Sequence, residues 1–408
     1  MASVDKAESV GDLVSRYRQE RDWSRRRLGQ EIGRSMSWVS QVERGELSVT
    51  DTNVLGRLAA LFGVPLSEFV EASMGPDADK IVRSRPYVEE VRLAIAGYPV
   101  AGSLESKATL GVSAVELRRF ENEVRKAWEL VHSSSYAELG PTLAQLILDL
   151  EASSRIVEKI GAVRILSCLA DAYQVAAAML TKVGDYGAAW VAGDRAIRAG
   201  ERCDDRGLIL AGQLRMAHTL LNSEEKELAR HVLTQGVRMV NGVEESADPG
   251  LISLAGACAL LLGILEAREH NSEEAERHLA IAVKFANSLG SDHNEYGTEF
   301  GPTNVAMHAV AIAVELGNGQ QAIDRAKMVK SGVLSPERQA RFLIDIARAH
   351  VLTRTPKQAV LALLEAEKIA REELVDLGIV ATVIEDIEEQ TKRERIPPLR
   401  ELKRRLYG

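Results

Sequence analysis

Cysteine and aromatic residues are scarce in this 408-residue chain. Its three cysteines, Cys168, Cys203 and Cys258, lie far apart and lack the spacing of a metal site. A sparse, odd set of this kind excludes a disulfide framework and favours small buried residues in a reducing compartment. Aromatic residues make up 4% of the chain, although 46% of it is hydrophobic. The core must therefore consist mainly of Ala, Leu, Val and Ile, which favours packed helices and an all-α fold.

Long apolar runs and catalytic signatures are also lacking. The longest uncharged stretch, residues 249–265, is shorter than the roughly 20 residues of a membrane helix and predicts a buried core helix instead. The first ten residues carry no basic region followed by an apolar run, so we expect no export signal and a cytoplasmic protein without membrane contact. We find no Gly-rich phosphate loop, nucleophile elbow or metal-ligand cluster, and therefore expect no enzyme activity, no cofactor and no metal.

Charge is distributed unevenly along the chain. The net charge of −8 at pH 7 argues against a general affinity for nucleic acid. Residues 16–44 nevertheless hold eight arginines against four acidic residues, a local balance of +4 that leaves −12 for the rest. One basic segment on an acidic body is the pattern expected of a site-directed contact with DNA.

The basic segment contains the pattern of a helix-turn-helix. Within residues 23–45, Ser24 and Ser35 can cap two short helices, over 25–32 and 36–44. This is the arrangement of a DNA-binding helix-turn-helix. Further signals complete the pattern: Gly33 and Gly45 after the two helices, an earlier helix ending near residue 22, a fourth helix capped by Asp51 and reaching residue 62, and a short fifth helix over 68–70 capped by Ser67.

The second of the two short helices presents small polar side chains on one face. Val39 and Val42 are three residues apart and would face Leu28 and Ile32 in the core. In a major groove, Gln can make a bidentate contact to adenine, Ser can donate or accept, and Met can touch a thymine methyl. Four side chains are left on this outer face: Met36, Ser37, Ser40 and Gln41.

These motifs resemble the five-helix DNA-binding domains of the Cro/phage-repressor (XRE) family. The resemblance covers residues 10–71 and rests on W-S-x-x-x-L-G-x-x-I-G, S-x-S-W-V-S-x-V-E-R-G and L-x-x-L-A-x-x-F-G-V. It implies that Arg18 pairs with Glu43. It also implies the DNA contacts: bases from Met36, Ser37 and Gln41 with Ser40 adjacent, and phosphates from Arg25 and Arg44.

The sequence departs from that family in two places. Arg34 occupies a turn position that is usually apolar, and the run Arg25-Arg26-Arg27 replaces a more usual Gln-Glu-Glu-like run. Both changes raise the affinity for phosphate without indicating an operator sequence. Two roles remain open for Trp38, which either packs partly in the core or donates its indole N–H to a phosphate.

The rest of the chain predicts a series of helices. We divide it into a DNA-binding domain over 1–74, a linker with some helix over 75–112, and a helical-repeat domain over 113–408. The basic tail predicts a last helix over 399–406 that caps the repeats or packs in a dimer. The expected helix pairs are 113–133 with 135–152, 156–182 with 186–201, 205–221 with 224–241, 249–269 with 272–289, 302–316 with 319–331, and 336–353 with 356–371.

A recurring alanine marks the second helix of five pairs, at spacings of 37 to 47 residues: Ala189, Ala229, Ala275, Ala322 and Ala359. The plan resembles tetratricopeptide (TPR) hairpins. Because one hairpin cannot bury its apolar face alone, neighbours are expected to stack into an α-solenoid with a concave face.

A helix-turn-helix followed by such repeats is similar to the peptide-pheromone receptor regulators of Gram-positive bacteria and to actinobacterial relatives. The resemblance implies a nucleoid-associated transcriptional regulator that senses a signal, with a peptide or small molecule as effector. A homodimer on a pseudo-palindromic double-stranded operator is expected, since one such domain gives modest affinity. The alternative is a repeat scaffold that docks a protein partner at DNA without a diffusible ligand.

One polar and aromatic interruption of the repeats, residues 291–304, is a candidate ligand-binding segment. The alternative is an ordered loop between repeats, with Asn304 near a helix start. The ligand-binding candidates are His293, Asn294, Tyr296, Phe300 and Asn304.

Overall fold

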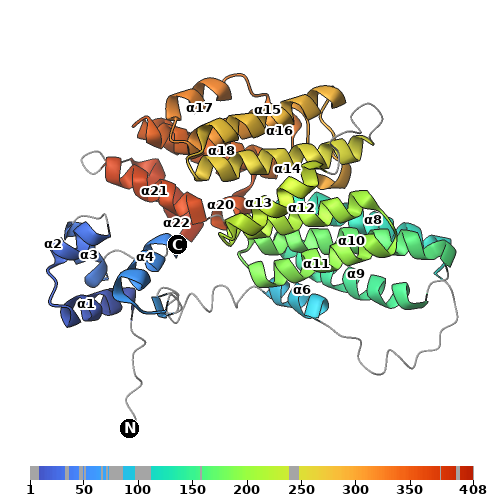
Figure 1. Cartoon of the computed structure of the whole chain (residues 1–408), viewed down its shortest axis with the longest axis horizontal. Coiled ribbons are helices and arrows are strands. Elements are labelled where there is room, and N and C mark those ends of the chain that lie inside the picture. Colours follow the sequence, from blue (N-terminus) through green and yellow to red (C-terminus); the bar gives the residue numbers. More distant parts are fainter. Residues whose placement is uncertain are drawn as a thin grey trace, which may run out of the picture. The chain divides into compact units, whose positions relative to one another are not determined.

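The computed structural model describes residues 9–32, 36–45, 49, 52–65, 68–69, 72, 86–96, 112–156, 159–238, 248–376, 378–391 and 396–407. Its elements in these ranges are all helices, and one isolated β-bridge joins His293 to Phe300. This confirms the predicted all-α fold. The chain divides into two compact units, Met1–Glu89 and Glu90–Gly408, each of which is described by itself below (Figure 1).

The first unit contains α1 (Val10–Glu20), α2 (Arg25–Glu31), α3 (Met36–Glu43) and α4 (Thr52–Phe62). Ser24 caps α2 as predicted, because its Oγ accepts a hydrogen bond of 3.1 Å from the N–H of Arg27. Gly45 follows α3 with φ +68°, the left-handed conformation that ends a helix. The other predicted turn and cap residues lie outside the described residues: Gly33, Arg34, Ser35, Asp51 and Ser67.

The core of the first unit is aromatic at its centre. Tyr17 and Phe62 stack with ring centroids 5.5 Å apart, and Phe62 stacks on Phe69 at 6.1 Å. A Cβ on Gly11 of α1 would overlap the carbonyl oxygen of Val42, so these two helices cross closely. The predicted core positions are all buried: Leu28, Ile32, Val39 and Val42.

Helix α6 (Pro86–Ala96) follows in the predicted linker, and six helix pairs come after it. The pairs agree with the predicted ones, and the five recurring alanines are fully buried. The pairs are α8 (Ala114–His132) with α9 (Tyr136–Ile156), α10 (Lys159–Lys182) with α11 (Tyr186–Arg202), α12 (Arg206–Asn222) with α13 (Lys226–Arg238), α14 (Pro249–Arg268) with α15 (Ser272–Leu289), α16 (Pro302–Glu315) with α17 (Gly319–Ala326), and α18 (Pro336–Leu352) with α19 (Pro356–Ile369).

Short elements complete the second unit: the 3₁₀ turns η1 (Glu295–Gly297) and η2 (Ser331–Val333), and helices α20 (Arg371–Asp376), α21 (Gly378–Gln390) and α22 (Pro397–Tyr407). The tail helix α22 packs on α19 and α20 and buries Leu399, Leu402 and Leu406. It therefore closes the apolar end of the repeats within the chain.

Two described helices are long and apolar enough to cross a membrane by length and composition alone, within 161–182 and in α14. Most of each lies inside the second unit, with 89% of the tested window of α14 buried. The prediction of a core helix over 249–265 is thereby confirmed.

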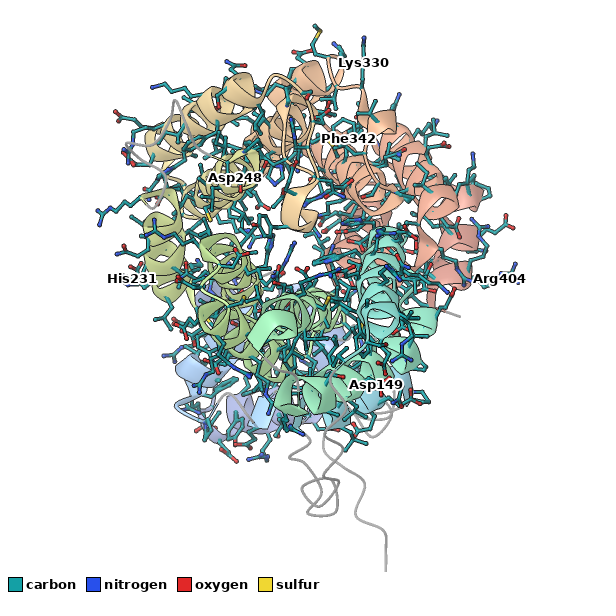
Figure 2. All side chains as sticks on the ribbon, turned by 90° about the vertical axis from the view of Figure 1, so that its right-hand side faces the viewer. Asp149, His231, Asp248, Lys330, Phe342 and Arg404 are labelled. Atoms are coloured by element: carbon teal, nitrogen blue, oxygen red, sulfur yellow. The ribbon has the colours of Figure 1, made fainter. Side chains whose placement is uncertain are left out.

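The second unit curls until its beginning meets its end, since α8 packs against α18 (Figure 2). We call the polar contacts at this closure the seam. The Nζ of Lys182 lies 2.5 Å from Glu337 and 2.8 Å from Glu373, and the N–H of Tyr136 donates to Glu372 at 3.0 Å. These contacts join α10 to α18 and α20 and close the ring of helices.

Candidate functional site

The outer face of α3 is open to solvent. Met36 is 58% exposed, Gln41 is exposed and Ser40 is half-buried. Trp38 is half-buried and packs against the core of the unit. The side chain of Ser37 lies outside the described residues. A short helix that packs one face against the core and exposes polar side chains on the other can enter a major groove.

Glu43 fixes the orientation of this helix. Its carboxylate, 2% exposed, accepts hydrogen bonds from the Nε of Arg18 at 2.5 Å and the Nε of Arg25 at 2.6 Å. Burial raises the pKa of Glu43, but the hydrogen bonds from Arg18 and Arg25 outweigh it and hold the pKa below its usual value. Arg18 also donates to the carbonyl of Trp23 at 2.8 Å. One carboxylate therefore ties α1, α2 and α3 together, through the Arg18–Glu43 pair that the sequence implied.

The two arginines with implied phosphate contacts flank the outer face of α3. The side chain of Arg25 remains 46% exposed although Glu43 holds its Nε. Arg44 is exposed, and its Nη1 donates to Ser40 Oγ at 3.1 Å. Both guanidinium groups are thus positioned by neighbours while still accessible, which suits contacts to a DNA backbone.

The second candidate site is a cavity of about 450 Å³ in the centre of the second unit. The first helix of each of the six pairs contributes most of its wall. Tyr186 at the start of α11, Gly297 of η1 and Ile379 of α21 complete it. Trp128, Met307 and Phe342 are among its apolar lining residues. The charged lining residues are six cations, Lys182, Arg215, Arg268, Arg338, Arg341 and Arg348, and three acids, Glu315, Glu337 and Asp345.

Three lining histidines carry no charge at neutral pH. Burial lowers the pKa of His132, His218 and His308, and Arg338 lowers each of them further. Arg215 has the same effect on His132 and His218, and Arg341 on His308, whereas Glu299 and Glu337 oppose the shift of His132. For His308 the pKa falls to about 4. The cavity therefore combines neutral imidazoles with a surplus of guanidinium groups.

Arg215 is the most enclosed of these cations. It is 7% exposed, its Cζ lies 4.8 Å above the ring of Trp128, and burial followed by the repulsion of Arg338 lowers its pKa to about 10. Its Nη2 donates to the carbonyls of Tyr296 and Gly297, at 2.8 and 3.1 Å. Arg215 thus binds the segment over 291–301 into the cavity wall.

That segment is anchored by two aromatic side chains. Tyr296 packs on Gly207 and Gly250, and a Cβ on Gly250 would lie 2.7 Å from its ring. Phe300 is fully buried against Gly256, where a Cβ would overlap its ring. Because these glycines on α12 and α14 have no Cβ, the rings of Tyr296 and Phe300 can pack directly against the two helices.

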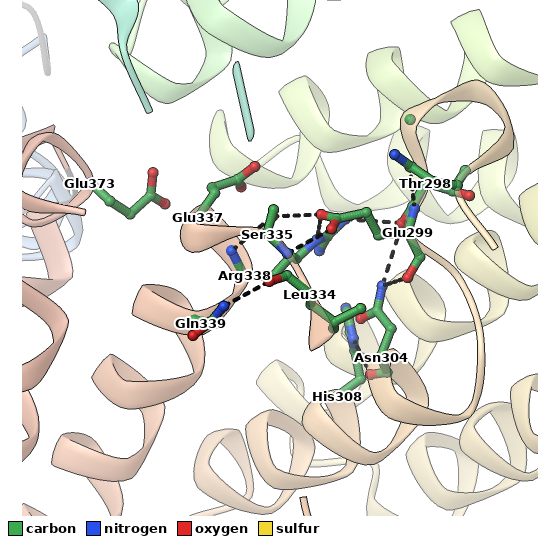
Figure 3. A network of polar contacts seen from close by, with 12 residues as sticks. Thr298, Glu299, Asn304, His308, Leu334, Ser335, Glu337, Arg338, Gln339 and Glu373 are labelled. Atoms are coloured by element: carbon green, nitrogen blue, oxygen red, sulfur yellow. Dashed lines mark hydrogen bonds and ion pairs between the residues drawn. The ribbon is translucent and has the colours of Figure 1, made fainter. Parts of the chain in front are cut away.

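The same loop is bound to α18 (Figure 3). Glu299 accepts hydrogen bonds from the N–H and Oγ of Ser335, at 2.8 and 2.7 Å. Arg338 donates to the carbonyl of Thr298 at 3.3 Å. Asn304, 2% exposed, donates through Nδ2 to the carbonyl of Glu299 at 2.8 Å. The loop is an ordered part of the repeat unit.

The five ligand-binding candidates are therefore placed differently. Asn304 lines the cavity. Tyr296 and Phe300 pack against glycines of the core, Asn294 accepts from the N–H of Glu299 at 3.0 Å, and His293 lies 3.2 Å from Glu295. Only Asn304 among these five belongs to the cavity lining.

Sequence reasoning missed the charged lining of α18. Arg338, Arg341, Asp345 and Arg348 recur at intervals of three and four, which places them on one helical face. A helical face with three arginines and one aspartate is usually exposed to solvent. Nothing in the linear pattern shows that a ring of helices encloses this one.

The cysteines and acidic groups offer no metal site within the described part of the chain. Cys168 and Cys258 are buried, and burial raises the pKa of each thiol to about 12. Cys203 is half-buried. All three are free thiols.

A family model described as a helix-turn-helix domain matches residues 9–72. The first unit is thus a helix-turn-helix DNA-binding domain, in agreement with its caps, its core and the exposed front of α3. Searches of curated proteins and of solved structures gave no match for this chain.

Proposed function

We propose that this protein is a sequence-specific transcriptional regulator of the XRE type. The single observation that carries the proposal is the helix-turn-helix match over 9–72, together with the polar, exposed front of α3 that Glu43 holds in place. Gln41 and Ser37 contact base edges, with Met36 and Ser40 beside them, and Arg25 and Arg44 contact phosphates. The protein is not an enzyme and acts in the cytoplasm.

The second unit is a TPR-like sensor. Six stacked helix pairs around a cavity of about 450 Å³ support the binding of a peptide or small-molecule effector, because this volume falls in the range of ligand pockets. The effector favours one arrangement of two DNA-binding domains over another in a homodimer bound to a pseudo-palindromic operator.

The test is a double variant, Gln41→Ala with Ser37→Ala. Operator fragments selected by the wild-type protein from random DNA are compared with unrelated DNA in a binding assay. The variant is expected to lose about 1–3 kcal/mol of discrimination per base contact and to keep its fold. Gln19→Ala, on the exposed face of α1, is the matched control. Unchanged sequence preference in the double variant contradicts the proposal.

A further inference from the structure

Four of the six cavity cations have an acid at contact distance, and Arg338 is one of them, with Glu299 at 3.5 Å. Lys182 pairs with Glu337 and Glu373, and Arg268 and Arg348 share Glu315. Arg215 donates only to neutral carbonyl groups. Arg341 makes no hydrogen bond or ion pair with any residue in the described part of the chain. Two guanidinium groups therefore line the cavity without a carboxylate at contact distance among the described residues. Carboxylates act on them through space only, Glu337 and Asp171 on Arg215, and Asp345 and Glu315 on Arg341.

An enclosed guanidinium group that no carboxylate contacts destabilises a fold unless other groups solvate it or a ligand neutralises it. Arg215 is 7% exposed and its Nε has no hydrogen-bond partner. Asn304 is 2% exposed and its Oδ1 also lacks one, while its Nδ2 is already used. Both residues line the cavity, so an unsatisfied donor and an unsatisfied acceptor are buried in the same wall.

The same cavity has an apolar side. Trp128, Leu261, Ile264, Met307 and Phe342 contribute to its lining. A volume of about 450 Å³ holds a small organic molecule or the end of a short peptide, and excludes a folded protein. The occupant that fits has an apolar body and a negatively charged end.

We propose that the cavity binds a small amphipathic anion, an apolar molecule with a carboxylate or phosphate group, whose charge is neutralised by Arg215 and Arg341. This inference rests on the proposed sensor function and names the chemistry of its effector. Arg215 lies on α12 and Arg341 on α18, so the bound anion joins the third helix pair to the sixth. Guanidinium groups suit this task because their planar donors match carboxylate and phosphate oxygens.

Arg341 provides the cleanest test because its replacement breaks no hydrogen bond or ion pair in the described part of the chain, and Arg348 still pairs with Asp345 and Glu315. The thermal unfolding of the full-length protein and of Arg341→Gln is measured with 4-phenylbutyrate, phenyl phosphate and the neutral 4-phenylbutyramide at millimolar concentration. The two anions are expected to raise the Tm of the wild type by about 1–3 °C, and the amide to leave it unchanged. Titration calorimetry is expected to show the anions binding about 10- to 100-fold more weakly to Arg341→Gln.

The control is Arg198→Gln, on the outward helix α11, whose side chain is 71% exposed. It should respond to the anions like the wild type. Without ligand, Arg341→Gln should have the same Tm as the wild type or a higher one. N-acetyl-dileucine and its C-terminal amide form a further arm, since a response to the acid alone points to a peptide terminus as the source of the anion.

Three results overturn the inference: equal stabilisation by 4-phenylbutyramide, an undiminished response of Arg341→Gln, or no stabilisation by any of the anions. Binding of the unliganded protein to its selected operator is measured in parallel. If that binding persists while the anions fail, the inference falls and the DNA-binding function stands.

Discussion

The two units place arginine in opposite surroundings. In the first unit Arg26 and Arg44 are exposed, and the enclosed Arg18 has Glu43 as its partner. In the second unit Arg215 is enclosed and contacts two carbonyl groups and the ring of Trp128, with no carboxylate at contact distance in the described part of the chain. Exposed arginines can bind any polyanion from outside, with a strength that depends on salt. An enclosed arginine can contact only an anion that fits its cavity, and so the proposed DNA contact depends on charge while the proposed anion site depends on charge and shape.

The cores differ in a corresponding way. The first unit is centred on Tyr17, Phe62 and Phe69, large side chains that fill a small core. The repeat unit uses alanine where helices pair, as at Ala189 and Ala275. Small residues bring helices close together, and they leave the enclosed space to polar side chains of the first helices. The comparison leads to five predictions, given from the largest expected effect to the smallest.

Lys182→Met should open the seam. It leaves Glu337 and Glu373 enclosed without their cation, and we expect a loss of about 3–5 kcal/mol in the free energy of unfolding of the second unit. Urea denaturation measures the loss, and hydrogen exchange should rise in α8 and α18. Lys327→Met, at a side chain 67% exposed, is the control and should change stability little. Equal losses in both variants contradict a structural role for the seam.

The seam should also be sensitive to acid. Burial raises the pKa of Glu337, but Lys182 outweighs it and the pKa falls to about 2, from a usual 4.5. Because the folded-state pKa is depressed, the stabilisation is present above about pH 4.5 and is lost as the pH falls towards 2. The pH dependence of unfolding should weaken in Lys182→Met.

Glu43→Gln should destabilise the first unit by about 3 kcal/mol, because it leaves the enclosed Arg18 without its partner. Loss of hydrogen-exchange protection in α1 and α3 of the full-length protein is the measurement. Glu20→Gln, whose side chain is 53% exposed, is the control. Destabilisation confined to α1 and α3 would show that the two units unfold separately.

Arg44→Gln and Arg341→Gln should each lose a property that the other variant keeps. The first should weaken DNA binding for all sequences and reduce its salt slope by about one, with the anion response of the cavity unchanged. The second should leave the salt slope of DNA binding as it is and lose the anion response. If both variants change DNA binding and the anion response alike, the proposed difference between exposed and enclosed arginines is wrong.

Gly56→Ala in α4 and Gly187→Ala in α11 should each stabilise their own unit by about 0.5–1 kcal/mol. A Cβ at either position meets nothing within 4 Å, so only the helix propensity changes. Thermal unfolding followed by calorimetry should show a separate shift for each variant. A fall in Tm for either contradicts the open surroundings of these glycines.

Local patterns were enough to predict the helices and the buried side of α3, whereas the DNA contacts of its outer face stay a prediction. The caps, the spacing of Val39 and Val42 and the turn glycine Gly45 depend on neighbours within a few residues, so they can be recognised along the chain. The wall of the cavity depends on ring closure, which brings Arg215 and Arg338 close together although they are far apart in sequence. For the segment over 291–304, the aromatic residues indicated an unusual loop, but the glycines that seat Tyr296 and Phe300 lie on other helices.

The seam also sets an order of events during synthesis. Lys182 and Glu373 are 191 residues apart, and the chain leaves the ribosome with its N-terminus first. The early helix pairs can stack on their neighbours as soon as they appear. The ion pair between Lys182 and Glu373, by contrast, can form only after residue 373 has left the ribosome. Until then the repeats form an open arc with their arginines in water, and the cavity exists only after closure, as the last product of folding.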